Sequence, residues 1–379
     1  MSRIPASPLA RLAALSFLTL AAGACASSGN NPQSTAEPLA IRPDLTWKIS
    51  TRYQVDLWLH GYAMLQKDTT LIPYFKPGYR DSIEAFKKRG NITTRLDTDR
   101  DSLRSQLASD SRLIGGQFLG LYFRTWETTQ KAIDQYLKNS VDDEMHTQRV
   151  NVRQMMDPDS RAVFGIIQAS YSTPAERQWL KRFTAAMQDE NTKYYADYWR
   201  TQQANRAPIF AAVDSLWRQI YFAKFRTFLA KSGQSRGEIL LSLPLDGEGR
   251  TLGEPGRGPT ITVTFPDSVS QAIDAIYVLA HEAVSPVSNA AVNDNTTPAE
   301  KKEGLADRYT SAAAVRGGLQ LLQKIAPELV IGYARHYLDA AHISYTPGAE
   351  VAAVEKAFPL RQSIADELTH QLNTDLSGG

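Results

Sequence analysis

Sequence of β-strand type is scarce in this chain and is confined to one short region. Residues 238–243 (EILLSL) form an apolar run of strand length, and residues 260–265 (TITVTF) alternate β-branched and apolar positions. From residue 45 to residue 232, apolar residues recur three and four positions apart, which is the spacing of one face of a helix. We therefore expect a mainly α fold of the α+β class, in which a helical unit is followed by a small sheet packed by helices.

The change in pattern after Ser232 predicts a domain boundary. It separates a helical domain, residues 45–232, from an α+β unit, residues 233–379. We expect the helical domain to contain no strand of more than a few residues. The two predicted strands are joined by a loop with five glycines, residues 246–258 (DGEGRTLGEPGRG), which is too long for a tight hairpin and is predicted to be functional or mobile.

The beginning of the chain has the pattern of an export signal. Arg3 and Arg11 supply positive charge ahead of an apolar run of 11 residues, LAALSFLTLAA, which ends at Ala22. A helix needs about 20 apolar residues to span a bilayer, so this run predicts a cleaved signal rather than a membrane-spanning helix. The signal occupies residues 1–25, and residues 26–44, rich in Ser, Asn, Pro and Ala, predict a flexible tether.

Cys25 is the only cysteine of the chain and follows Ala-Gly-Ala, so this segment resembles a bacterial lipobox. Lipidation of Cys25 would anchor the protein to a membrane of the cell envelope, and Ala26 after it is typical of lipoproteins passed on to an outer membrane. The same segment is also acceptable for ordinary signal cleavage, which would leave the protein free in the periplasm or secreted. A chain with one cysteine forms no internal disulfide, so its stability depends on its core.

Composition and charge argue against one class of partner. The chain has 379 residues, of which 42% are hydrophobic, so it can bury a large core. Its 42 Lys and Arg residues nearly balance 40 Asp and Glu residues, which gives a formal net charge of +2 at pH 7. No overall field attracts a polyanion, and we expect no nucleic-acid partner.

The main candidate for a chemical site lies in YVLAHEAVSPVSN, residues 277–289. An apolar stripe predicts a buried helix that starts at Asp267 and carries His281 and Glu282. In zinc peptidases with the sequence H-E-x-x-H, two histidines four residues apart bind zinc, and the glutamate is the general base for the metal-bound water. Here Ser285 occupies the position of the second histidine.

Pro286 adds a second departure from that pattern. Proline has no N–H to donate to the carbonyl of Glu282, and it biases Ser285 away from helical backbone angles. We therefore expect the helix to break or kink where the second ligand would stand. With the ligand replaced and the helix broken, we expect no bound cofactor unless other residues hold zinc.

The order of strand, glycine-rich loop, strand and His-Glu helix resembles the gluzincin-type metallopeptidases. The similarity is greatest to a secreted group whose helix has the sequence H-E-x-x-H-x-x-x-N, and three residues match it: His281, Glu282 and Asn289. In that group a later helix supplies a third ligand, a glutamate a few residues before an arginine. In SAAAVRGG, Arg316 matches the arginine and Ala312 takes the glutamate position. The resemblance implies a gluzincin-like fold with a degenerate zinc site.

Other residues are candidates to rebuild a metal site. Glu303 falls one residue short of the glutamate spacing used by the aminopeptidase branch of the gluzincins. His336 and His342 are further candidates, but they are six residues apart and do not share a helical face. His60, within DLWLHGYAML, is surrounded by apolar and aromatic residues and is expected to be a hydrogen-bonded packing residue.

These features favour an exported, lipid-anchored protein whose degenerate metallopeptidase-like site acts in binding or scaffolding, with a peptide or protein as its ligand. One alternative is a zinc-dependent hydrolase with substituted metal ligands. In that enzyme Glu282 is the catalytic base, and His281 and Glu303 are metal ligands. Another alternative is a structural lipoprotein with no site.

Overall fold

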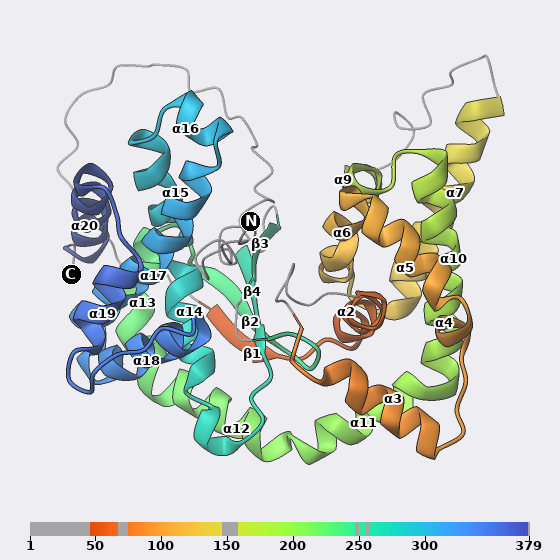
Figure 1. Cartoon of the computed structure of the whole chain (residues 1–379), viewed down its shortest axis with the longest axis horizontal. Helices are drawn as coiled ribbons and strands as arrows, with labels where there is room; N and C mark the ends of the chain where they lie inside the picture. Colours follow the sequence, from red (N-terminus) through yellow and green to blue (C-terminus); the bar gives the residue numbers. More distant parts are fainter. Residues whose placement is uncertain (1–45, 67–74, 146–157, 247–249, 255–257, 378–379) are drawn as a thin grey trace, which may run out of the picture.

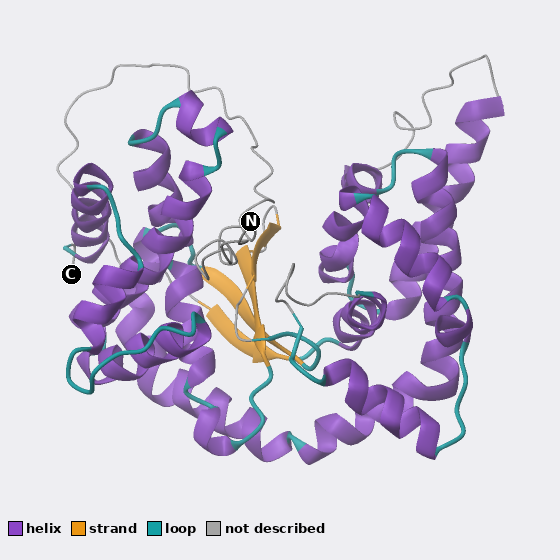
Figure 2. Cartoon of the chain, viewed as in Figure 1, coloured by secondary structure: helices purple, strands orange, loops and turns teal. Residues whose placement is uncertain are grey.

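The protein is described from a computed structural model that places residues 46–66, 75–145, 158–246, 250–254 and 258–377. As predicted, the fold is mainly helical with one small sheet (Figure 2). In Figure 1 a helical unit lies on one side of the sheet and the C-terminal helices lie on the other. A run of helices passes along the lower side of this view and joins the two groups.

The sheet has four strands in the order β1-β2-β4-β3. Its strands are β1 (Thr46–Ser50), β2 (Arg236–Ser242), β3 (Arg250–Glu254) and β4 (Gly258–Thr264). β1 and β4 both pair in parallel with β2, so Ile239 lies between Ile49 and Ile261, whereas β3 pairs antiparallel with β4. All three of these isoleucines are buried, as is typical of parallel strands covered on both faces.

Two predictions about strands are wrong. β1 lies in the part of the chain predicted to contain no strand of more than a few residues, because its five residues, TWKIS, are too few to show a strand period. The predicted loop of residues 246–258 contains β3, which is held by backbone pairing with β4. Backbone hydrogen bonds form a ladder whatever the side chains are, so a glycine-rich sequence did not reveal this strand.

The helical unit is built around α2, which is buried along nearly its whole length. Its helices are α2 (Tyr53–Leu65), α3 (Tyr79–Arg89), α4 (Arg95–Thr98), α5 (Arg100–Ser109), α6 (Ser111–Gly115), η2 (Gly116–Tyr122), α7 (Trp126–Met145), α9 (Pro158–Ser170) and α10 (Pro174–Glu190). The sequence TPAE at the start of α10 forms a capping box, in which Thr173 and Glu176 satisfy each other's backbone N–H groups. Such a cap explains why α10 starts where it does.

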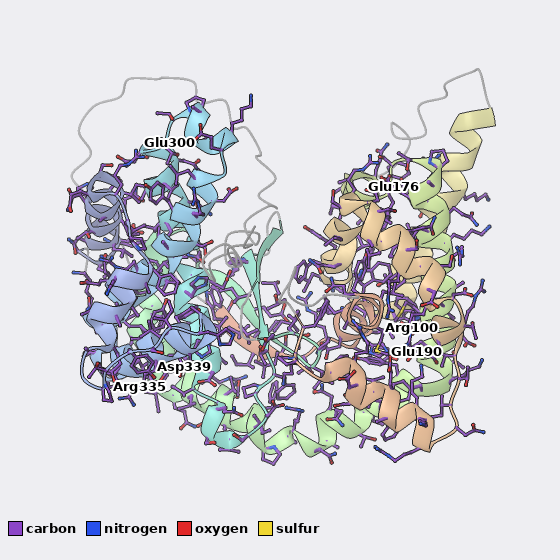
Figure 3. The ribbon with its side chains drawn as sticks, viewed as in Figure 1. Arg100, Glu176, Glu190, Glu300, Arg335 and Asp339 are labelled. Carbon is purple, nitrogen blue, oxygen red and sulfur yellow. The ribbon has the colours of Figure 1, made fainter. Side chains whose placement is uncertain are left out.

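A buried group of charges lies inside the helical unit around Glu190, which is labelled in Figure 3. Glu190 accepts hydrogen bonds from His60 Nε2 at 3.1 Å, from Lys87 Nζ at 2.9 Å and from the Thr94 hydroxyl. Burial alone would raise the pKa of Glu190, but these hydrogen bonds hold it below its ordinary value. His60 Nδ1 lies 3.0 Å from the Tyr79 hydroxyl, so the prediction that His60 is a hydrogen-bonded packing residue is confirmed.

One nearly continuous run of helix leads from the helical unit to the sheet. After α10 it consists of η3 (Asn191–Tyr195), α11 (Ala196–Asn205), α12 (Ala207–Ser215), η4 (Leu216–Tyr221) and α13 (Phe222–Lys231). Arg206 separates α11 from α12 with non-helical backbone angles. The run therefore changes direction at Arg206 while its helical hydrogen bonding continues on both sides.

Two hydrophobic cores divide the chain at a place that differs from the predicted boundary. One core belongs to the helical unit and includes Trp58 and Phe183. The other is formed by the sheet and the C-terminal helices, and it also contains Trp47 of β1 together with Trp217 and Phe225 of the connecting run. Residues 207–231 thus pack with the C-terminal unit, because their apolar side chains face the sheet.

Asp56 of α2 forms hydrogen bonds that connect the two hydrophobic cores. Its carboxylate accepts hydrogen bonds from the Ser242 hydroxyl at 2.6 Å, from the Leu243 backbone N–H at 3.2 Å and from Trp199 Nε1 at 2.9 Å. Asp56 is buried, and burial raises its pKa to about 7 in spite of these hydrogen bonds. An ionisable group therefore joins α2, the carboxyl end of β2 and the connecting run.

The C-terminal helices cover the sheet and complete the fold. They are η5 (Val269–Gln271), α14 (Asp274–Ala283), α15 (Ser285–Asp294), α16 (Pro298–Lys302), α17 (Leu305–Ile325), η6 (Pro327–Leu329), α18 (Val330–Ala340), α19 (Glu350–Ala357) and α20 (Gln362–Leu376). The second TPAE sequence, at Thr297, forms another capping box, with Glu300 at the start of α16. α17 packs against α14, α15 and α20 at the centre of this group.

Candidate functional site

The His-Glu pair lies at the C-terminal end of α14, which packs on β4 and α17. The middle of α14 is buried, with Ile276 and Leu279 in the core, as its apolar stripe predicts. The predicted start of this helix at Asp267 is wrong, since α14 begins at Asp274 after the short turn η5. The reason is that the Asp267 carboxylate accepts hydrogen bonds from Lys76 and Arg206 instead of capping a helix.

His281 is held by contacts within its own surroundings. Its Nδ1 atom lies 3.2 Å from the Glu282 carboxylate, and its ring stacks on Tyr337 of α18 with the centroids 5.0 Å apart. The side chain of His281 is 14% exposed and that of Glu282 is 8% exposed. His281 is thus packed against α18, with a small part of the imidazole facing solvent.

The helix is interrupted where the second zinc ligand of the peptidase pattern would stand. α14 ends at Ala283, Val284 adopts φ −84° and ψ −7°, and α15 begins at Ser285 with Pro286 in its first turn. The predicted break is confirmed, because proline suits a first helical turn and interrupts a helix interior. The Ser285 hydroxyl donates to the His281 carbonyl oxygen at 3.4 Å, so it bonds to the backbone of the preceding turn.

The other residues that match the peptidase pattern are dispersed. Asn289 is half-buried on α15, and Ala312 is buried on α17. Arg316 of α17 forms an ion pair with Glu355 of α19 at 3.4 Å. Glu303 is exposed at the end of α16. Among the residues that the structure describes, no three His, Cys, Asp or Glu side chains converge on a point that could hold a metal ion.

The tertiary structure does bring one sequence candidate towards His281. His336 of α18 packs edge-on against the Tyr337 ring with the centroids 5.1 Å apart, so both histidines contact the same tyrosine. Burial, with a smaller contribution from the neighbouring His281, lowers the pKa of His336 to about 4. His336 is therefore a neutral imidazole near pH 7. The other histidine candidate, His342, lies beyond the end of α18 in a turn with φ of 56°.

A cavity of about 260 Å³ lies beside His336, and the sequence patterns did not predict it. Lys76 of the helical unit and Asp274 of α14 contribute polar groups to its wall. Lys76 precedes a proline, and Asp274 is the first residue of α14. Polar side chains are common at both kinds of position, so no local sequence pattern distinguishes these two residues. Knowledge that β2 and β4 are parallel would have pointed to this edge, because ligands of α/β sheets bind beyond the carboxyl ends of parallel strands.

Cys25, the export signal and the tether lie outside the residues that the structure describes. Across the described ranges, no helix has the length and the apolar character needed to cross a membrane.

The fold and the site together define a mainly helical α+β protein whose mixed sheet carries an interrupted helix with a His-Glu pair. Comparison with protein-family models, with curated proteins and with solved structures finds no match to this chain.

Proposed function

We propose that this chain is an exported cell-envelope protein, anchored by a lipid on Cys25, whose C-terminal unit descends from gluzincin-type metallopeptidases and binds a peptide or protein without cleaving it. The interruption of α14 at Val284 carries the non-catalytic part of this proposal. A zinc site of the H-E-x-x-H type needs its two histidines one turn apart on one continuous helix. Here the helix ends two residues after His281.

The surroundings of His281 and Glu282 support the same conclusion. The imidazole is engaged by Glu282 and by the Tyr337 ring, and the Ser285 hydroxyl is bonded to the His281 carbonyl. Losing two of three protein ligands removes most of a binding free energy that reaches about 10–16 kcal/mol for a complete structural zinc site. An imidazole packed on Tyr337 and hydrogen-bonded to Glu282 is suited to maintaining the shape of a binding surface.

We expect the purified protein to bind Zn²⁺ no more tightly than in the micromolar range. Ser285→His alone should not produce peptidase activity, because Ala312 leaves the third carboxylate missing and the helix is interrupted at the altered position. Isothermal titration with Zn²⁺ and a fluorogenic peptide assay measure the two quantities. Ser285→Ala is the matched control, since it changes the same side chain without adding a ligand.

The opposite result would support the zinc hydrolase with substituted ligands. In that case one zinc ion binds per chain with a dissociation constant well below micromolar, and the protein without substitutions cleaves peptides. Glu282→Gln should then abolish turnover and leave the metal content unchanged, because the glutamate acts on the bound water rather than on the metal. His336 would be the first residue to test as a ligand, since it approaches the same tyrosine as His281.

Lipid anchoring has a separate test. The protein expressed in a bacterium should partition into the detergent phase, and Cys25→Ser should move it to the aqueous phase, because acyl chains attached to this residue supply the membrane affinity. Immunoblotting of the two phases measures the distribution. If the Cys25→Ser protein still partitions into the detergent phase, Cys25 does not carry a lipid anchor and this part of the proposal is wrong.

A further inference from the structure

The cavity of about 260 Å³ lies where the helical unit meets the C-terminal unit. Its polar lining comes from both units and is made by Lys76, Asp246, Thr264, Asp267, Gln271, Asp274 and His336. The cavity adjoins the carboxyl end of β4, the segment that follows β2 and the first turn of α14. A concave site with a few convergent polar groups at the carboxyl edge of parallel strands is a common location for a small ligand.

The charged groups in one wall of the cavity already form hydrogen bonds and ion pairs within the protein. Lys76 Nζ donates to the Phe265 carbonyl oxygen at 2.7 Å and to the Asp267 carboxylate at 2.8 Å. Arg206, at the bend between α11 and α12, donates to the same carboxylate at 2.7 Å. These contacts join the helical unit, the connecting run and the C-terminal unit, so they position the wall and leave little capacity to bind an anion.

Asp274, in the first turn of α14, differs from Asp267. In the described part of the chain, no lysine or arginine lies within 4.0 Å of its carboxylate, and the nearest basic nitrogen is His336 Nδ1 at that distance. His336 is neutral near pH 7, because burial lowers its pKa to about 4. The Asp274 side chain is 40% exposed, so its charge is open to a ligand that enters the cavity.

The Thr264 hydroxyl is a second group that lacks a partner. Its oxygen is shielded from solvent, and it forms no hydrogen bond with any residue that the structure describes. A buried hydroxyl without a partner costs free energy, so a ligand that supplies a hydrogen bond there would remove this cost. Thr264 and Asp274 line the same cavity, together with the apolar side chains of Ala275 and Val278.

We propose that this cavity binds the primary ammonium group of a small molecule, with Asp274 as its ion-pair partner and Thr264 and His336 as hydrogen-bond acceptors. An ammonium has three N–H donors and no acceptor, which matches one carboxylate, one hydroxyl and one neutral imidazole. The alkyl part of the ligand would lie against Ala275 and Val278. A carboxylate or phosphate would be repelled by Asp274, whose charge no lysine or arginine of the described chain neutralises within 4.0 Å.

This inference goes beyond the proposed function, since it assigns a different site and a different ligand and requires nothing of His281. The volume admits only a small molecule, so n-butylamine is a suitable probe, and butan-1-ol and butyrate are its neutral and anionic counterparts. Calorimetric titration of the full chain in detergent should show saturable binding of butylamine, with butan-1-ol and butyrate weaker by about tenfold or more.

Variants separate this site from the rest of the molecule. Asp274→Asn should weaken butylamine binding by about tenfold or more, and Thr264→Val by less, because the first removes a charge and the second removes one neutral hydrogen bond. Asp366→Asn, an exposed carboxylate on α20, should leave binding unchanged.

Three outcomes would overturn the proposal. They are a failure of butylamine to bind, binding of butan-1-ol as tight as that of butylamine, or equal affinities for the original protein and both cavity variants. Circular dichroism establishes that each variant is folded. If Asp274→Asn fails to fold, the affinity of Thr264→Val decides the outcome, because the Thr264 hydroxyl forms no hydrogen bond in the described structure that the fold would lose.

Discussion

Replacing Lys87 with methionine should lower the free energy of unfolding by about 3 kcal/mol, because it leaves a buried carboxylate without its cation. Lys87 Nζ lies 2.9 Å from Glu190 and 2.6 Å from Asp97, and both Lys87 and Glu190 are almost completely buried. Burial lowers the pKa of the remaining partner, His60, so the histidine does not readily take up the missing positive charge. Urea denaturation followed by tryptophan fluorescence measures the change.

Lys193→Met is the matched control for this prediction. Lys193 forms an ion pair with Asp189 at 2.9 Å, one turn away on the same run of helix, but its side chain is 52% exposed. An exposed pair of this kind contributes little, so the control should change the free energy of unfolding by less than about 1 kcal/mol. Equal effects of the two substitutions would show that burial of the Glu190 cluster does not increase the contribution of Lys87 to the free energy of unfolding.

The second large effect concerns pH and Asp56. Burial raises the pKa of Asp56 from 3.8 to about 7, so the folded protein binds a proton more tightly there than the unfolded chain does. The contribution of Asp56 to stability is therefore greatest below pH 4 and is lost as the pH rises to about 7. Over this window the loss is on the order of 4 kcal/mol, since each pKa unit corresponds to about 1.36 kcal/mol.

Asp56→Asn should remove this dependence. The asparagine oxygen can still accept from Ser242 and Leu243, and only the hydrogen bond from Trp199 is lost. We expect the variant to be slightly less stable than the original protein at pH 4 and to gain relative stability as the pH rises to 8. Denaturation curves at intervals of one pH unit measure the difference, and the exposed Asp197→Asn is the control. Parallel curves for Asp56→Asn and the original protein would contradict the raised pKa.

The features predicted correctly from the sequence are local ones. The TPAE helix starts at Thr173 and Thr297 and the break before Pro286 depend on residues within one helical turn of each other, and the structure shows all three. The strands β2 and β4 were recognised because each contains an apolar or alternating run of strand length. His60 was correctly placed in the core, because its neighbours in the sequence are apolar and aromatic.

Two of the incorrect predictions involve pairing between distant segments. Thr46 of β1 lies beside Arg236 of β2, and no local pattern reveals a partner so far along the chain. Asp267 was expected to cap a helix, but Lys76 and Arg206, from two other parts of the chain, take its carboxylate. The tendency of an aspartate to cap a helix is overridden when ion pairs with distant residues occupy the same carboxylate.

By itself, the sequence determined the mainly helical fold class, the positions of several helix ends and the substitution of serine at the second ligand position, because these depend on neighbouring residues. Only the tertiary structure decided that His281 stacks on Tyr337 and that Asp274 faces a cavity shared by two units. The physical reason is that burial, ion pairing and pKa are set by every segment packed around a side chain. Those segments meet only after the chain has folded.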